Sequence, residues 1–215
     1  MKREWLNLYF VMGSVDCNGR DPRDVLQEAI KGGITLFQFR EKGDGVKVGV
    51  EKLSLARELK EICKSNNIPF IVNDDIDLAL KVKADGVHIG QEDAPFSVVD
   101  ELLAPGMIIG VSCHTVEEAA AAVNNWADYI GVGPMYFTDT KKDIREVKGP
   151  GVIKEIRNAG LTVPIVGIGG ITVENAAEVL AAGADGVAVI SAISKAESAL
   201  EAAKEFIRIH NIVTN

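Results

Sequence analysis

Polar residues that suit the binding of phosphorylated groups follow a series of short apolar runs along the sequence. Arginine and lysine side chains attract an anion, whereas aspartates beside them would repel it unless a divalent cation lay between. Magnesium is commonly held by one or two carboxylates together with phosphate oxygens of a substrate. The pattern therefore predicts a diphosphate bound with Mg²⁺. The residues that follow the apolar runs, called the polar set below, are Gln38, Arg40, Lys42, Asn73, Asp74, Asp93, Ser112, residues 138–141, Gly170 and Ser191.

A second anion site is predicted within residues 163–194. An apolar run over residues 164–168 ends at Gly169 and Gly170, and another over residues 186–190 ends at Ser191. Glycine turns at the ends of consecutive parallel strands expose backbone N–H groups, which bind phosphate well. The alternative is that the two glycines only make a tight turn. Thr172 is expected to cap the helix that follows.

The elements that must position these residues alternate regularly between strand and helix patterns. The acidic turns at Ala84, Ala127 and Ala184 resemble one another, as repeated βα units should. Strands are expected at residues 6–12, 34–40, 69–72, 87–89, 107–111, 129–132, 164–168 and 186–190. Helices are expected at residues 24–31, 46–66, 76–81, 95–103, 116–125, 152–158, after Thr172, and at 196–209.

Eight parallel strands with right-handed crossovers close naturally into a barrel. The predicted fold class is therefore α/β, with a single (β/α)8 TIM barrel over residues 1–215. Active sites of such barrels lie at the C-terminal ends of the strands, so the polar set is expected to meet there.

Composition excludes several classes of partner. A net charge of −8 and an isoelectric point near 5.0 argue against nucleic acid or an anionic membrane surface. No apolar run has transmembrane length and no secretory leader is evident, so a cytoplasmic location is expected. The three cysteines have no CxxC spacing, which gives no indication of a disulfide framework or a zinc site.

Taken together, the motifs resemble those of the thiamine phosphate synthase family over nearly the whole chain. Such enzymes are (β/α)8 barrels that join 4-amino-2-methyl-5-(diphosphooxymethyl)pyrimidine (the pyrimidine diphosphate) to 4-methyl-5-(2-phosphooxyethyl)thiazole (the thiazole phosphate), releasing diphosphate. Phe137 departs from the pattern, which has proline there. The motifs are QFREK at 38–42, ND at 73–74, GVHIGQED at 86–93, GVS at 110–112, GP at 133–134, TDTKKD at 138–143 and GIGGI at 167–171.

The resemblance also implies a role for each matching residue. Asp74 and Asp93 would hold one Mg²⁺ ion. Pyrimidine diphosphate binding falls to Gln38, Phe39, Arg40, Glu41, Lys42, Asn73, Ser112 and Lys141, of which Arg40, Lys42, Ser112 and Lys141 would be catalytic. Thiazole phosphate binding falls to Thr138, Asp139, Thr140, Gly170, Ile190 and Ser191. Two phosphorylated small molecules are thus the expected partners, with a second copy of the chain as a further candidate.

Three other functions remain open at this point. A related thiazole tautomerase would share the thiazole phosphate site but needs no site for diphosphate and Mg²⁺. Asp74, Asp93 and Lys141 would form such a site, so they favour the synthase. A phosphosugar epimerase or isomerase needs a facing acid and base, for which only the two aspartates are candidates. A non-catalytic phosphate-binding barrel would leave those aspartates unexplained.

Several of these residues also have a purely structural interpretation. Asp74 or Asp75 could cap the helix that follows, and Arg40 with its charged neighbours could be an ordinary solvated charge run. His88 lies within a strand and is expected to be a core histidine. Cys113 beside His114 does not indicate a thiol nucleophile, because adjacent residues of a strand point to opposite faces.

Overall fold

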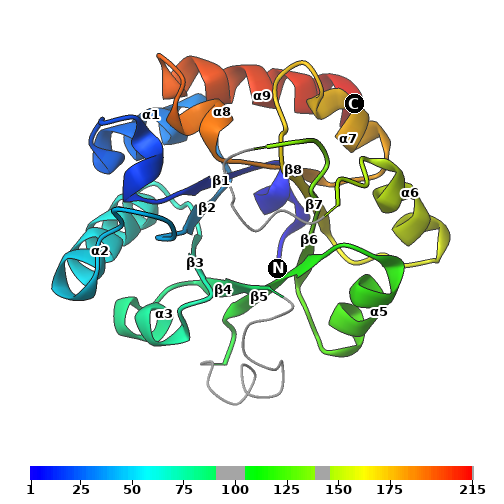
Figure 1. The fold of residues 1–215 in the computed structure, drawn as a ribbon, viewed down its shortest axis with the longest axis horizontal. Coiled ribbons are helices and arrows are strands. Elements are labelled where there is room, and N and C mark those ends of the chain that lie inside the picture. The colour runs from blue at the N-terminus through cyan, green and yellow to red at the C-terminus, as the bar shows by residue number, and fades with distance from the viewer. Residues whose placement is uncertain (91–104, 139–145, 215) are drawn as a thin grey trace.

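A closed ring of eight parallel strands organises the molecule, and the helices lie outside it (Figure 1). The computed structural model describes residues 1–90, 105–138 and 146–214. Each strand pairs with its neighbour in sequence order, and β1 closes the ring against β8, where Tyr9 lies opposite Ala188. The predicted (β/α)8 barrel is therefore confirmed.

The strands are short and almost wholly buried, as expected for parallel strands that are covered on both faces. Their bounds lie close to the predicted ones. They are β1 (Leu8–Met12), β2 (Leu36–Phe39), β3 (Phe70–Asn73), β4 (Gly86–Ile89), β5 (Ile108–Cys113), β6 (Tyr129–Val132), β7 (Ile165–Ile168) and β8 (Gly186–Val189).

Helices alternate with the strands, and some of them begin at side-chain caps. Asp21 accepts a hydrogen bond from the Arg23 backbone at 2.8 Å, and Thr115 accepts one from Glu118 at 3.1 Å. Among the described residues, no helix combines the length and apolar character needed to cross a membrane. The helices are η1 (Arg3–Leu6), η2 (Ser14–Cys17), α1 (Pro22–Gly32), α2 (Gly49–Ser65), α3 (Ile76–Val82), α5 (Val116–Asn124), α6 (Gly151–Asn158), α7 (Ala176–Ala181), α8 (Ser191–Ser194) and α9 (Ala199–Thr214), of which η1 and η2 are 3-10 helices.

The structure corrects two helix predictions, while the helix predicted at 95–103 lies outside the described residues. A separate short helix, α8, precedes α9, which begins at Ala199. Thr172 does not cap α7. Instead, the side chain of Asn175 accepts from the Thr172 backbone at 2.8 Å and donates to the Gly170 carbonyl at 3.0 Å, so α7 starts only at Ala176.

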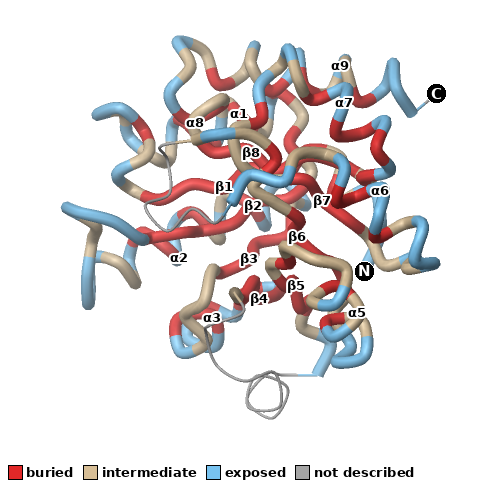
Figure 2. Tube along the Cα trace, turned by 45° about the vertical axis from the view of Figure 1, so that its right-hand side comes forward, coloured by how far each residue is buried: buried red, intermediate tan, exposed pale blue. Residues whose placement is uncertain are grey.

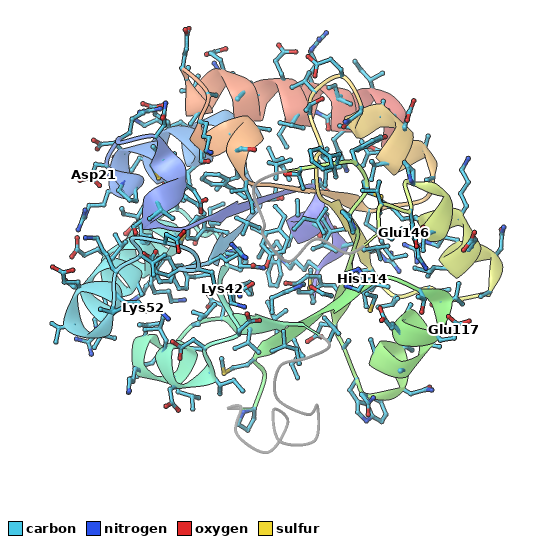
Figure 3. The ribbon with its side chains drawn as sticks, in the orientation of Figure 1. Asp21, Lys42, Lys52, His114, Glu117 and Glu146 are labelled. Atoms are coloured by element: carbon cyan, nitrogen blue, oxygen red, sulfur yellow. The ribbon has the colours of Figure 1, made fainter. Side chains whose placement is uncertain are left out.

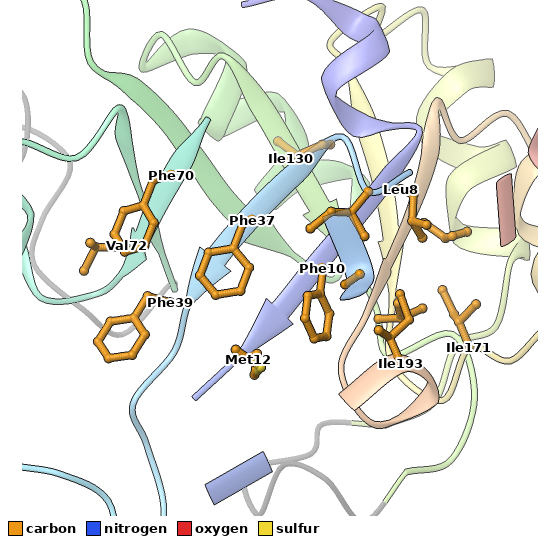
Figure 4. Packing of buried hydrophobic residues seen from close by; sticks show 14 of the residues in the cluster. Leu8, Phe10, Met12, Phe37, Phe39, Phe70, Val72, Ile130, Ile171 and Ile193 are labelled. Atoms are coloured by element: carbon orange, nitrogen blue, oxygen red, sulfur yellow. The ribbon is translucent and has the colours of Figure 1, made fainter. Parts of the chain in front are cut away.

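Side chains alternate between the two faces of each strand and divide the core in two. Outward-facing side chains such as Phe10, Phe37 and Phe70 pack beneath the helices. Figure 4 shows these rings on neighbouring strands, and the rings of Phe37 and Phe70 lie 5.7 Å apart. Buried positions concentrate in the strands, and exposed ones on the outer helices (Figure 2). Inward-facing side chains fill the barrel: Leu6, Tyr9, Val11, Leu36, Ile71, Ile108, Tyr129, Val166, Ala188 and Ile190.

Candidate active site

Gln38 and Arg40 point into the barrel, because they share the orientation of Leu36 in β2. Only 4 % of Gln38 and 8 % of Arg40 is exposed. The Arg40 backbone donates to the Met12 carbonyl at 3.0 Å, which ties it to the end of β1. Gly13 permits this approach, since a Cβ atom there would lie 2.2 Å from the Arg40 carbonyl oxygen. The ends of β1 and β2 thus place a guanidinium at the rim of the barrel.

Phe39 and Glu41 have the opposite orientation, so their side chains do not face the barrel interior. The Phe39 ring stacks on Phe70 in the outer core, with centroids 6.3 Å apart (Figure 4). The Glu41 carboxylate accepts from the backbone of Ser14 at 2.8 Å and of Lys47 at 2.7 Å, and from the Ser14 hydroxyl. Glu41 therefore holds together the loops that follow β1 and β2.

Lys42, Asn73 and Asp74 meet at the ends of β2 and β3. The Lys42 ammonium forms an ion pair with Asp74, and the Asn73 amide donates to the same carboxylate at 2.6 Å. Figure 3 shows Lys42 inside the ring of helices, whereas Lys52 belongs to α2 on the outside. Asp74 has a backbone φ of 60°, in the left-handed region that aspartate adopts more readily than most non-glycine residues.

The structural role of helix cap belongs to Asp75 and not to Asp74. Asp75 accepts from the Leu78 backbone at 2.9 Å and pairs with Lys52 at 2.7 Å. Burial opposes ionisation of Asp75, but the hydrogen bonds from Lys52 and Leu78 outweigh it and lower the pKa of the carboxyl. The Asp74 carboxylate is therefore held toward Lys42 and the rim.

The residues at the end of β3 fit a magnesium ion that a substrate helps to bind. Mg²⁺ takes one or two protein carboxylates and completes its shell with water and phosphate oxygens. Asp74 supplies one such carboxylate, next to the Lys42 ammonium at the same rim. Within the described ranges, no group of three or more acidic, histidine or cysteine side chains could hold a metal. Asp93, the other predicted ligand, lies outside these ranges.

Ser112 lies near the end of β5, where it shares the inward orientation of Ile108. His88 Nε2 lies 2.9 Å from its Oγ atom, and His88 Nδ1 lies 2.9 Å from the hydroxyl of Tyr129. The prediction of a core histidine is confirmed, since only 8 % of His88 is exposed. Its contact with Ser112 was not foreseen. Alternation along β4 could have indicated an inward side chain, because His88 lies between the apolar Val87 and Ile89, which face the helices.

The predicted second anion site forms a pocket between β7 and β8. Gly169 and Gly170 have φ values of 100° and 63°. A Cβ atom on Gly170 would also lie 2.5 Å from the Phe137 carbonyl oxygen, so glycine is required there twice over. The glycine turn and the start of α8 are both arrangements that present backbone N–H groups to an anion. The pocket is lined by Thr138, Ile168, Gly169, Gly170, Ile171, Ala188, Val189, Ile190 and Ser191.

Thr138, Gly170, Ile190 and Ser191 are thus brought together as the sequence predicts. Predicted site residues that lie outside the described residues are Asp93, Asp139, Thr140 and Lys141.

Cys113 is fully buried and faces the helices, not the barrel interior. Burial raises the pKa of its thiol to about 12, and the nearby charge of Glu118 acts in the same direction. The thiol therefore stays protonated at neutral pH, which excludes it as a ready nucleophile.

Comparison with known sequences identifies a family model and close relatives of the chain. Residues 8–193 match a family model described as thiamine monophosphate synthase. A thiamine-phosphate synthase of Bacillus cereus is 55% identical over 202 residues, which span 94% of this chain and 89% of that protein. One from Bacillus thuringiensis is 54% identical over 94% of this chain and 91% of its own.

Solved structures agree with the sequences. Thiamine phosphate pyrophosphorylase from Pyrococcus furiosus is 35% identical, with a TM-score of 0.86 and 99% of each chain covered. A 3-hexulose-6-phosphate synthase, with a TM-score of 0.70, covers 95% of this chain and 99% of its own, but at 17% identity it shows only the shared fold. With its (β/α)8 barrel and the family match over most of its length, the chain belongs to the thiamine monophosphate synthase family, whose members are transferases.

Proposed function

We propose that the chain joins the pyrimidine diphosphate to the thiazole phosphate, giving thiamine phosphate and diphosphate. The observation that carries this proposal is the presence of two separate places for anions on one rim. Arg40, Lys42 and Asp74 lie at the ends of β2 and β3, whereas the glycine pocket lies between β7 and β8. Two phosphorylated substrates can therefore bind at the same time.

Coupling is proposed to be dissociative. The bond between the pyrimidine methylene carbon and the diphosphate oxygen breaks first, and the aminopyrimidine ring delocalises the positive charge that remains. The thiazole nitrogen then attacks with its own lone pair, so no general base is needed. Cys113, which is buried beneath the helices with a raised thiol pKa, does not serve as a nucleophile.

The residues of the chain then act by binding, orientation and charge stabilisation. Arg40 and Lys42 stabilise the negative charge of the departing diphosphate, and Ser112 binds the same group. Thr138 and the glycine turn hold the thiazole phosphate so that its nitrogen faces the methylene carbon. Asp74 would hold the Mg²⁺ ion, which when bound supplies further stabilisation of the leaving diphosphate.

A single reaction mixture tests the proposal. Purified protein, both substrates and Mg²⁺ are incubated, and thiamine phosphate and diphosphate are quantified with and without a chelator. Equal, metal-dependent formation of both products is expected. If neither product formed while the thiazole phosphate still bound, a tautomerase or a binding protein would replace the synthase. Asp74→Asn, which removes a charge at constant size, is the first variant to compare.

A further inference from the structure

A chain of hydrogen bonds crosses the interior of the barrel beneath the site. The Gln38 amide donates to the Tyr9 hydroxyl at 2.7 Å, and the Tyr9 and Tyr129 hydroxyl oxygens lie 2.7 Å apart. Tyr129 contacts His88 Nδ1, and His88 Nε2 contacts Ser112, each at 2.9 Å. These hydrogen bonds thus link β2, β1, β6, β4 and β5 and reach Ser112 at the rim.

Each hydroxyl in this chain carries one proton, which fixes the direction of the hydrogen bonds. Burial raises the pKa of Tyr9 and of Tyr129, so both keep their protons. The Gln38 Nε2 atom can only donate, so the Tyr9 oxygen accepts. Within the described residues, the other partner of the Tyr9 hydroxyl is Tyr129. The Tyr9 proton therefore goes to the Tyr129 oxygen, because a buried hydroxyl proton without an acceptor is costly.

The same reasoning extends to the imidazole. Tyr129 accepts from Tyr9, so its own proton goes to His88 Nδ1, its other partner within the described ranges. A neutral imidazole that accepts at Nδ1 carries its proton on Nε2, and this proton is donated to Ser112 Oγ. The Ser112 proton must then be directed to a group other than His88.

We infer that Tyr9, Tyr129 and His88 are positioning residues that fix the Ser112 hydroxyl as a hydrogen-bond donor toward the substrate. The inference rests on the proposed function, because it needs an anionic substrate beside Ser112. A diphosphate oxygen only accepts hydrogen bonds, so a serine turned the other way would present a lone pair to it. The oriented hydrogen bonds exclude this unproductive orientation of the Ser112 hydroxyl before the substrate binds.

The tautomer of His88 can be measured directly by NMR. The full chain is labelled with ¹⁵N-histidine, and the His88 signals are identified by their loss in His88→Gln. A neutral ring with the proton on Nε2 is expected at pH 7.5. A ring protonated on Nδ1, or on both nitrogens, would overturn the inference. In Tyr129→Phe the donor to Nδ1 is absent, and we expect a mixture of the two neutral tautomers.

Steady-state kinetics separate positioning from folding damage. Tyr129→Phe and Tyr9→Phe keep the packed ring and remove one hydroxyl each. The value of kcat/KM for the pyrimidine diphosphate should fall about tenfold or more, as expected when a hydrogen bond to a charged group is impaired. The KM for the thiazole phosphate should stay unchanged. Equal losses for both substrates would indicate general damage and contradict the inference.

Two substitutions of His88 form a matched pair. The amide nitrogen of His88→Gln falls near the Nε2 position and can still donate to Ser112, whereas that of His88→Asn falls near Nδ1 and cannot reach it. The glutamine variant is expected to retain at least several times more activity toward the pyrimidine diphosphate. The reverse order would overturn the assignment. His210→Gln, near the opposite end of the barrel, is the control, because His210 contacts the carbonyl of Asp185 at 3.3 Å.

The inference and the proposed function can fail separately. Binding of inorganic diphosphate with Mg²⁺ is measured by calorimetry for the unmodified protein and for Tyr129→Phe. Weaker binding by the variant supports the oriented serine even if no thiamine phosphate is formed. Full synthase activity together with an Nδ1-protonated His88 would instead retain the function and reject the inference.

Discussion

The hydroxyl oxygens of Tyr9 and Tyr129 lie 2.7 Å apart in the middle of the barrel, although the two residues are 120 positions apart in the sequence. Their rings meet edge to face, with centroids 5.8 Å apart. Gly110 of β5 makes this arrangement possible, since a Cβ atom there would lie 2.1 Å from Cζ of Tyr129. A missing side chain on one strand thus provides the space for a tyrosine of the next.

Gly110→Ala should therefore destabilise the barrel. The added methyl group would collide with the buried Tyr129 ring, and overpacking of this kind costs about 1–3 kcal/mol. Urea unfolding followed by circular dichroism measures the loss. The control is Gly151→Ala at the start of α6, where a Cβ atom meets nothing within 4 Å. Its unfolding free energy should stay within about 0.5 kcal/mol of the unmodified protein, and an equally small change for Gly110→Ala would contradict the packing argument.

Replacement of Arg40 should reduce turnover far more than it reduces stability. Loss of one preorganised group that stabilises developing negative charge costs roughly a hundredfold in kcat. We expect this from Arg40→Ala, with partial recovery in Arg40→Lys, measured as diphosphate release. Arg23→Ala removes another arginine that pairs with acidic groups, but on the exposed surface of α1, and should change turnover by less than about twofold. Unchanged turnover in Arg40→Ala would remove Arg40 from the catalytic residues.

The alternation of side chains between the two faces of a strand explains how far the sequence could predict the site. Strand order and the C-terminal rim follow from the repeated βα pattern. The structure places Arg40 and Ser112 near that rim, with the Gln38 side chain directed into the barrel beneath it. Phe39 and Glu41 stand within the same QFREK motif. A side-chain period of two separates them from Gln38 and Arg40, and that rule could have been applied to the sequence alone.

Other features depend on contacts between distant segments and could not be predicted in this way. The hydrogen bonds that connect Tyr9, Tyr129 and His88 require side chains of several strands to converge inside the barrel. The start of α7 moved from Thr172 because Asn175 binds the Gly170 carbonyl, a local competition that propensity does not resolve. Tertiary packing and side-chain hydrogen bonds decided these details.

Gly170→Ala should weaken binding of the thiazole phosphate. The residue has a φ of 63°, and a Cβ atom would lie 2.5 Å from the Phe137 carbonyl oxygen, which is backbone and cannot easily move. We expect KM for the thiazole phosphate to rise about tenfold or more, because the turn that lines the pocket must shift. Gly160→Ala carries a similar strain, with a φ of 82°, but has nothing within 4 Å. A rise in KM shared by both variants would point to strain and not to the pocket.

Alkaline pH should destabilise the fold through its buried thiols. Burial raises the pKa of Cys17 and Cys113 from 9.0 to about 12, and raises that of Cys63 as well. Above pH 9 the unfolded chain loses thiol protons that the folded chain keeps, so the unfolded state binds fewer protons and the free energy of unfolding falls as pH rises.

The effect is on the order of 1 kcal/mol per thiol for each pH unit above 9, and buried Tyr9 and Tyr129 add to it above pH 10. Urea titrations at pH 8, 9, 10 and 11 measure the slope, which should be smaller in Cys63→Ala, where one of the buried thiols is absent. In parallel, a thiol reagent at pH 8 should leave the three cysteines of the folded protein unreacted and label all of them in urea. Equal stability at pH 8 and pH 11, or rapid labelling of the folded chain, would show that these thiols are not held protonated by burial.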